Sequence, residues 1–151
     1  MSILAISKGI QNSFDILDTW EAGIVLTGPE VKSVRMKRMN LKGSYISLEK
    51  GELWLKGAHI SAYEPAATVQ RNYDPSHTRK LLVRKQELHS LVGKLNEKGL
   101  TILPLNVYTK ARLIKVEVAL VRGKKKHDKR AVIKKREIDR DIRRHLKTQM
   151  R

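Results

Sequence analysis

Histidines, acidic residues and serines are the side chains that could catalyse a reaction or bind a metal, and none of them forms a recognisable constellation. No two of the five histidines are spaced i, i+3 or i+4, the spacing that places two metal ligands on one helix face, and the chain has no cysteine. Nucleophile-elbow, P-loop and dinucleotide motifs are also missing from the sequence. We therefore predict that the chain is not an enzyme and binds neither a metal nor another cofactor.

The most distinctive chemistry lies in residues 123–130, Gly-Lys-Lys-Lys-His-Asp-Lys-Arg, where one His and one Asp stand among basic residues. This octet joins two parts of different composition. Residues 122–151 contain fourteen Lys or Arg against four Asp or Glu, whereas residues 1–121 contain eighteen against eleven. We predict a globular body over 1–121 and a basic arm over 122–151.

The net charge of +17 predicts a polyanionic partner. Nucleic acid is favoured because neutralised phosphates release condensed counterions. A membrane surface is the alternative, and it is disfavoured because the arm lacks the broad apolar face of an interfacial helix. In the arm, only a narrow stripe at i+4 spacing is apolar: Ile138, Ile142, Leu146 and Met150. We expect the arm to be disordered when free and helical on an anionic partner, the alternative being an unstructured solubilising tail.

The sequence predicts a cytoplasmic protein. It has no cysteine, which fits a reducing compartment, and its first residues lack the basic and long apolar regions of a signal peptide. No apolar run approaches the roughly 20 residues of a membrane-spanning helix.

Within the body, alternation of apolar and polar residues predicts strands and a 3.6-residue period predicts helices. The strand over 14–26 contains Gly23, which would allow a bulge or a close approach. Pro29 predicts the start of a helix that runs to Arg38 and exposes Lys32 and Arg35. The remaining expectations are a short helix within 7–13, a hairpin of strands 41–49 and 53–60, a loop over 62–76, a strand over 79–84, a helix over 85–98 and strands over 103–107 and 114–120.

These elements predict a mainly β fold, a small antiparallel barrel of the OB type with about six strands and two or three short helices. A ferredoxin-like α+β sandwich is the alternative. Aromatic residues make up only 5% of the chain, which argues against a reader of single strands and favours contact with folded RNA. Trp20 and Trp54 are accordingly more typical of core residues than of stacking platforms.

Glu21 is unusual because it lies within an apolar strand of a strongly basic protein. A carboxylate there would orient a Lys or Arg, or accept hydrogen bonds from a nucleotide. An acid on the surface of an edge strand is an equally good interpretation of the same residues.

Taken together, six motifs in order resemble the small protein B family, the SsrA-binding proteins, over nearly the whole chain. They are Glu-Ala-Gly-Ile-Val-Leu at 21–26, Gly-Pro-Glu-Val-Lys-Ser at 28–33, Asn-Leu-Lys-Gly-Ser-Tyr at 40–45, Asp-Pro at 74–75 with Thr-Arg-Lys-Leu-Leu at 78–82, Lys-Gly-Leu-Thr at 98–101 and the octet. The resemblance implies an OB-type barrel that binds the tRNA-like domain of transfer-messenger RNA (SsrA RNA) as a monomer.

The resemblance further implies that protein and RNA enter stalled bacterial ribosomes for trans-translation and ribosome rescue. The arm would become helical in the empty mRNA channel, against 16S rRNA near the decoding centre. The protein would not itself be the catalyst. A general ribosome-associated RNA-binding protein without a tagging partner is the alternative function, and a membrane-surface protein is a third.

Two sets of site residues follow. The resemblance assigns Glu21, Leu82 and Lys115 to RNA binding, and we add the basic or polar residues Lys32, Arg35, Asn40, Arg79 and Lys80. It places His127, Asp128, Lys129 and Arg130 at the decoding centre, with Gly123, Lys124 and Lys125 beside them.

The chain departs from the family pattern at four places. Pro29 stands where Thr is common, and Ser7-Lys8-Gly9 stands where an Asn followed by basic residues is expected, which puts an N-terminal RNA contact in doubt. His77 replaces an expected Arg and would weaken a phosphate clamp at neutral pH. Lys110-Ala111-Arg112 stands where an Asn-Gly turn is usual.

Overall fold

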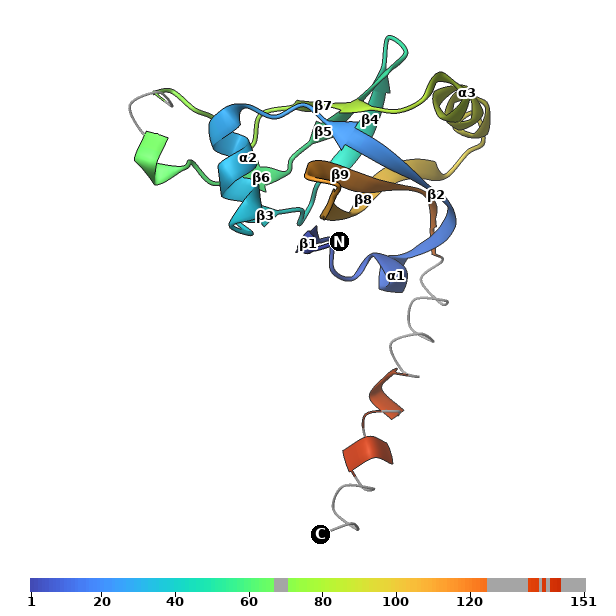
Figure 1. The fold of residues 1–151 in the computed structure, drawn as a ribbon. Helices are drawn as coiled ribbons and strands as arrows, with labels where there is room; N and C mark the ends of the chain where they lie inside the picture. The colour runs from blue at the N-terminus through green and yellow to red at the C-terminus, as the bar shows by residue number, and fades with distance from the viewer. Residues whose placement is uncertain (67–70, 125–135, 139, 141, 145–151) are drawn as a thin grey trace.

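Six strands close into an antiparallel barrel in the computed structural model, which describes residues 1–66, 71–124, 136–138, 140 and 142–144 (Figure 1). Around the ring each strand is hydrogen-bonded to the next, and the last pairs with the first. In order they are β8 (Leu100–Lys110), β4 (Tyr45–Glu49), β5 (Glu52–Lys56), β7 (Arg79–Leu82), β2 (Phe14–Ile24) and β9 (Leu113–Gly123). The predicted mainly β barrel is therefore confirmed, and a sheet that closes on itself replaces the α+β sandwich alternative.

Strand β8 pairs with three other strands. One edge pairs with β9 along its whole length. The other edge pairs with β4 through Ile46 and Ile102, and farther along with β1 (Ile3–Ile6), which lies outside the ring. Strand β1 was not predicted from the sequence. Its two central residues are buried and its two ends are exposed.

A bulge bends the long strand β2, but it does not lie at Gly23 as predicted. The pairing of β2 with β9 shifts register between Ile16 and Asp18, whereas Gly23 keeps regular partners on both sides. A methyl group added at Gly23 would meet the Cβ of Leu82 at 3.5 Å, an ordinary contact. Gly23 therefore neither bulges nor allows an unusually close approach.

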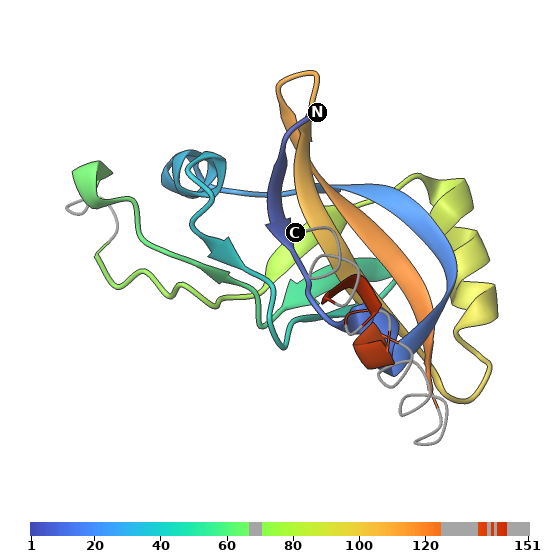
Figure 2. The same ribbon diagram turned by 90° about the horizontal axis from the view of Figure 1, so that it is seen from below.

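The barrel is flanked by helices α1 (Ile10–Ser13), α2 (Gly28–Arg35) and α3 (Lys85–Lys94), with a 3₁₀ turn at Glu64–Ala66. Helix α2 begins at a capping box in which Thr27 and Glu30 bond each other's backbone N–H groups. It ends at Arg35, short of the predicted Arg38, because Lys37 has a left-handed φ of 62°. Figures 1 and 2 place α2 and α3 on opposite sides of the barrel.

The barrel interior is filled by apolar side chains from every strand of the ring and from two helices. Val34 of α2 and Leu91 of α3 are fully buried in it. The same cluster includes Leu41, Ile46, Leu53, Leu55, Ile60, Leu81, Ile102, Val116, Val118 and Leu120. Trp20 and Trp54 are both half-buried. Trp20 packs against this core, which agrees with its interpretation as a core residue.

The hairpin predicted over 41–60 forms in two pieces. Strands β4 and β5 are joined by the turn Lys50-Gly51, and β3 (Met39–Asn40) pairs with β6 (His59–Ile60) as a separate two-stranded sheet. Strands β8 (Leu100–Lys110) and β9 (Leu113–Gly123) are both longer than predicted. Each extends beyond the predicted ranges 103–107 and 114–120 at both ends.

Strand β9 continues to Gly123, two residues past the boundary predicted for the body. The backbone N–H of Lys124 then donates to Ser13 O at 2.8 Å, and its Nζ donates to Gln11 O at 2.8 Å. In the arm, residues 136–138, 140 and 142–144 are helical, and Ile138 and Ile142 are about half exposed. Most of the arm lies outside the described residues, so its predicted disorder when free stays a prediction.

Candidate nucleic-acid interface

Glu21, Leu82 and Lys115, which are far apart in the sequence, lie together around Gly23 of β2. Strand β2 runs between β7 and β9, and Gly23 pairs with Leu82 on one side and with Lys115 on the other. Glu21 is two residues before Gly23 and therefore on the same face of the strand. Since Gly23 has no side chain, the sheet surface between Leu82 and Lys115 is hollow, and all four residues line this hollow.

The Glu21 carboxylate is fixed by two neighbours on the last hairpin. Tyr108 donates its hydroxyl to Glu21 Oε2 at 2.5 Å, and Lys110 Nζ lies 3.3 Å from the same oxygen. The Tyr108 hydrogen bond, aided by Lys110, lowers the pKa of Glu21. Burial and the neighbouring Glu21 carboxylate raise the pKa of Tyr108, so its hydroxyl stays protonated.

Glu21 is therefore an ionised acceptor at neutral pH, and its side chain remains 36% exposed. A carboxylate repels phosphate and accepts hydrogen bonds from base N–H groups or ribose hydroxyls. The exposed Leu82 supplies an apolar surface beside it, and Lys110, Lys115 and Arg84 supply cations around the same hollow. This arrangement is suited to contacting a nucleotide through its base or sugar while its phosphates lie against the cations.

Two further predicted residues, Arg35 and Lys32, lie on α2. Arg35 lines a second hollow that shares Gly23, Leu82 and Lys115 with the first. Its Nη2 donates to the backbone O of Arg112 at 2.9 Å, which ties α2 to the β8–β9 turn. Lys32 is exposed, and its Nζ lies 5.4 Å from the centre of the Tyr63 ring.

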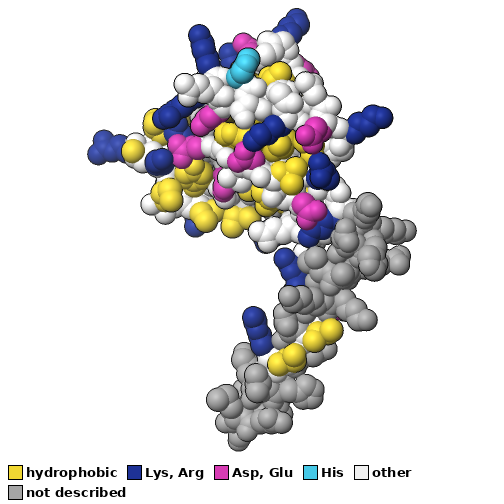
Figure 3. Space-filling model, turned by 90° about the vertical axis from the view of Figure 1, so that its right-hand side faces the viewer, with side chains coloured by type: hydrophobic (Ala, Val, Ile, Leu, Met, Phe, Trp, Pro, Cys, Tyr) yellow, Lys and Arg dark blue, Asp and Glu magenta, His cyan; other side chains and the backbone are white. Residues whose placement is uncertain are grey.

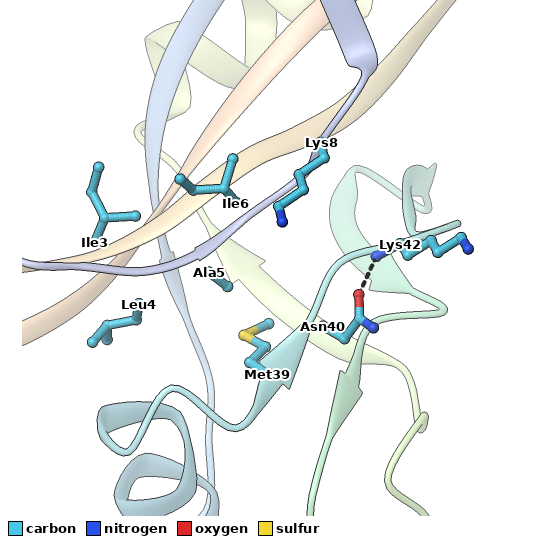
Figure 4. A pocket seen from close by; sticks show the side chains of 8 residues that line it. All are labelled: Ile3, Leu4, Ala5, Ile6, Lys8, Met39, Asn40 and Lys42. Atoms are coloured by element: carbon cyan, nitrogen blue, oxygen red, sulfur yellow. Dashed lines mark hydrogen bonds between the residues drawn. The ribbon is translucent and has the colours of Figure 1, made fainter.

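Lys80 and Asn40 lie away from these two hollows. Lys80 Nζ is 3.2 Å from Glu52 Oε1 on β5, in a half-exposed ion pair. Asn40 is on β3, where its Oδ1 accepts the backbone N–H of Lys42 at 2.9 Å (Figure 4). It lines a separate hollow between β1 and β3, which Lys8 of the divergent N-terminal segment also lines.

Arg79 is buried, which corrects the prediction that it clamps phosphates. Its guanidinium donates to Glu30 Oε2 at 2.7 Å and to the backbone oxygens of Ala58 and Pro75 at 2.8 Å each. Its side chain has no exposed surface. Arg79 was predicted to contact RNA because it precedes Lys80 in a basic stretch, and the sequence does not reveal that its partner is an acid 49 residues earlier.

The partner of Arg79, Glu30, also receives bonds from the loop that precedes β7. Tyr73 OH lies 3.0 Å and His77 Nε2 lies 2.9 Å from Glu30 Oε2. Burial acts to raise the pKa of Glu30, but the Thr27 N–H and the Arg79 guanidinium outweigh it and lower the pKa to about 2. His77, which replaces an expected Arg, thus contacts a buried carboxylate rather than forming an open phosphate clamp.

Of the predicted decoding-centre residues, the structure describes only Gly123 and Lys124. Gly123 ends β9, and the Lys124 side chain is only 12% exposed against α1 and β2. Lys125, His127, Asp128, Lys129 and Arg130 lie outside the described residues.

Sequence reasoning missed Tyr108, Lys110 and Arg112 as parts of this surface. Tyr108 meets Glu21 across 87 residues of sequence, and only the β8–β9–β2 strand order brings them together. The one available signal was the unusual Lys-Ala-Arg turn. Within the described part of the chain, no group of three or more His, Cys, Asp or Glu is placed to hold a metal, and no helix is long and apolar enough to cross a membrane.

Seen from the α3 side, the barrel surface carries Lys and Arg side chains interspersed with Asp and Glu (Figure 3). On α3, Lys94 pairs with an acid of β2. Its Nζ lies 2.7 Å from Asp18 Oδ2 and 5.5 Å from the centre of the Trp20 ring. This mixture contrasts with the hollows around Gly23, where cations outnumber acids.

Comparison with known proteins gives one consistent family. The family model described as SmpB protein matches residues 4–148. Proteins named SsrA-binding protein are 48% identical over 134 residues in Gloeothece citriformis (89% of this chain, 86% of the relative) and 45% identical over 146 residues in Streptococcus mutans (97% and 93%). Another from Halothermothrix orenii is 43% identical over 151 residues, covering 100% of this chain and 96% of its own.

A solved structure is also similar. It is described as "tmRNA-SmpB: a journey to the center of the bacterial ribosome", and one of its chains matches with a TM-score of 0.65 and 40% identity. The match covers 85% of this chain and 92% of that one.

Proposed function

Because this chain belongs to the SmpB protein family, the SsrA-binding proteins, we propose that it binds transfer-messenger RNA and delivers it to stalled ribosomes for trans-translation and ribosome rescue. The similar solved chain belongs to a tmRNA-SmpB assembly on the bacterial ribosome. The RNA and the ribosome are accordingly the partners of this chain, and its site of action is the bacterial cytoplasm.

The single observation that supports RNA binding most strongly is the convergence of Glu21, Leu82 and Lys115 around Gly23. The pairing of β2 with β7 and β9 brings a hydrogen-bond acceptor, an apolar side chain and a cation into one hollow of the sheet. Glu21 accepts from a base or ribose of the tRNA-like domain, Leu82 packs on it, and Lys115 with Lys110 neutralises phosphates. In this proposal the protein acts as a binding partner of the RNA and not as the catalyst.

The basic arm has a separate role in this proposal. The body binds the RNA, and the arm, from about residue 124 onward, enters the empty mRNA channel, whose walls are ribosomal RNA. His127, Asp128, Lys129 and Arg130 contact the decoding centre, where an imidazole stacks on a base and a lysine would not. The charge distribution supports this division, since residues 122–151 are far more densely basic than the body. One copy of the protein serves one RNA.

A gel-shift experiment with the tRNA-like domain of transfer-messenger RNA tests the proposed function. We expect the full chain to bind this domain much more tightly than an unrelated folded RNA of equal length at moderate salt. Equal affinity for both RNAs would mean that the protein binds RNA by charge alone, as a general ribosome-associated protein does.

A matched pair of carboxylate variants sharpens the test. Glu21→Gln keeps the size of the side chain but removes its charge and one strong acceptor, so we expect weaker binding of the tRNA-like domain. Glu49→Gln removes an exposed acid next to the β4–β5 turn and should leave affinity unchanged. Equal behaviour of the two variants would exclude a specific role for Glu21.

A further inference from the structure

The β8–β9 turn carries backbone strain that an Asn-Gly sequence would avoid. Ala111 and Arg112 are its two central residues, with φ of 48° and 68°. A two-residue hairpin turn needs positive φ at both positions, and Asn-Gly meets that need at little cost, whereas Ala and Arg do not. Strained residues that persist in a stable fold are commonly found where they place a functional side chain.

Arg112 lines the second hollow of the candidate interface, between α2 and this turn. The Arg35 guanidinium holds the turn by donating to Arg112 O at 2.9 Å. Within the described part of the chain, the Arg112 guanidinium itself has no hydrogen-bond or ion-pair partner. The turn thus presents a free cation beside Arg35 and Lys115, at the rim of the hollow.

The floor of this hollow is apolar and open to solvent. Leu113, the first residue of β9, is 58% exposed, and Leu82 is 53% exposed. Ile24, Leu26 and Ile114 also line it. Exposed leucines surrounded by three cations fit a ligand that has an apolar ring and an anionic group, and a nucleotide has both.

The position of the hollow identifies which nucleotide-bearing partner it would take. It shares Gly23, Leu82 and Lys115 with the hollow that contains Glu21, so the two form one continuous surface. A single RNA that contacts Glu21 therefore extends over the turn.

We propose that the hollow between α2 and the β8–β9 turn is a second nucleotide-binding pocket for the same RNA. It takes an unstacked nucleotide with its base or ribose on Leu113 and Leu82 and its phosphate between Arg112 and Arg35. This inference rests on the proposed function and adds Arg112 and Leu113 to the residues that bind the RNA.

The test uses Arg112→Gly in the full-length protein, because relief of strain and loss of a cation change stability and affinity in opposite directions. We expect Tm to be unchanged or raised, since glycine adopts positive φ freely. Affinity for the tRNA-like domain should fall on the order of fivefold at about 0.1 M salt, and the slope of log K against log salt should become shallower by about one.

Three further variants separate the Arg112 side chain from the shape of the turn, from apolar contact and from general surface effects. Ala111→Asn relieves strain at the neighbouring position without removing a cation, and its affinity should equal that of the wild type. Leu113→Ser should weaken binding roughly threefold with an unchanged salt slope, because it removes apolar contact and not charge. Val92→Ser, at an exposed site on α3, should have no effect.

The possible outcomes are distinguishable. The proposal of a second nucleotide-binding pocket is contradicted if Arg112→Gly and Leu113→Ser bind the RNA as the wild type does while Glu21→Gln binds it weakly. Equal weakening by Ala111→Asn and Arg112→Gly would assign the effect to turn shape and contradict the phosphate contact. Failure of the wild type to prefer this RNA would overturn the proposed function, and the pocket with it.

Discussion

At the scale of the residue, the shape of the candidate interface depends on what Gly23 lacks. Leu82 and Lys115 stand on either side of it in the sheet, and a side chain at position 23 would fill the space between them. The sequence marks Gly23 as a break in an apolar strand and suggests a bulge. In the structure the pairing at Gly23 is regular, and the glycine instead leaves a space on the sheet surface between Leu82 and Lys115.

Gly23→Ala should therefore separate stability from binding. The new methyl group meets Leu82 at ordinary van der Waals distance, and the backbone is not left-handed, so stability should be unchanged or raised by about 0.5 kcal/mol. RNA affinity should fall roughly fivefold, as a cost of about 1 kcal/mol implies. Thermal melting and gel shifts measure the two quantities.

Gly93→Ala is the matched control for Gly23→Ala. Gly93 is exposed within α3, and a methyl group added there meets no other atom within 4 Å. This variant should be more stable by about 0.5–1 kcal/mol and should bind RNA normally. Normal binding by both variants would mean that the hollow at Gly23 is not occupied by RNA.

In the arm, the prediction for a single residue concerns His127. His127→Ala should leave affinity for the tRNA-like domain within about twofold, since we propose that the body binds the RNA. It should slow peptide tagging by fivefold or more, as the loss of about 1–3 kcal/mol of stacking implies. Reconstituted translation on a message without a stop codon measures tagging. His145→Ala, the other histidine of the arm, serves as the control. Weakened RNA affinity of His127→Ala would assign the octet to the body's own site.

At the scale of the element, the buried Glu30 carboxylate fixes three segments against one another. It caps the first turn of α2, pairs with Arg79 of β7 and bonds Tyr73 and His77 of the preceding loop. Lys32 and Arg35 are exposed on the helix that Glu30 begins. The cluster therefore sets where the cations of α2 lie relative to Leu82.

This cluster predicts a specific loss of stability in acid. The pKa of Glu30 in the folded protein is about 2, below its ordinary value of 4.5. Its contribution is therefore fully present above about pH 4.5 and is lost as pH falls toward 2, and it amounts to about 3 kcal/mol. Denaturant unfolding at pH 7, 4 and 2.5 measures it.

Glu30→Gln provides the comparison for the acid titration. It leaves Arg79 buried without a counter-charge, so stability at pH 7 should fall by about 3–5 kcal/mol. Below pH 4.5, the free energy of unfolding of this variant should depend on pH less steeply than that of the wild type. An equally steep dependence in both proteins would show that other carboxyl groups dominate acid unfolding.

The elements differ in how far the sequence could predict them. Strands β4 and β5 and helix α3 were predicted because one face of each is more buried than the other, which imposes a period on the sequence. Strands β8 and β9 were also predicted from alternation, although residues 102–104 and 118–121 are buried in succession. Strand β1 was not, since only Leu4 and Ala5 of its four residues are buried. The partners of Glu21 and Glu30 could not be read either, because Tyr108 and Arg79 meet them through the closure of the barrel.

At the scale of the whole molecule, charge and packing divide the chain at the same place. The buried apolar residues of the described chain lie between Leu4 and Val121, and β9 ends at Gly123. Beyond it the sequence is densely basic. We therefore propose that the body folds and binds the RNA without the residues after 124.

Truncation after Lys124 tests this division most directly, with RNA affinity and peptide tagging measured on the same preparation. Lys124 is retained because it bonds the end of β9 to Ser13 and Gln11. We predict that the truncated chain binds the tRNA-like domain within a few-fold of the full chain and does not support tagging on stalled ribosomes. Loss of specific RNA binding together with the arm, or normal tagging without it, would contradict the proposed roles of body and arm.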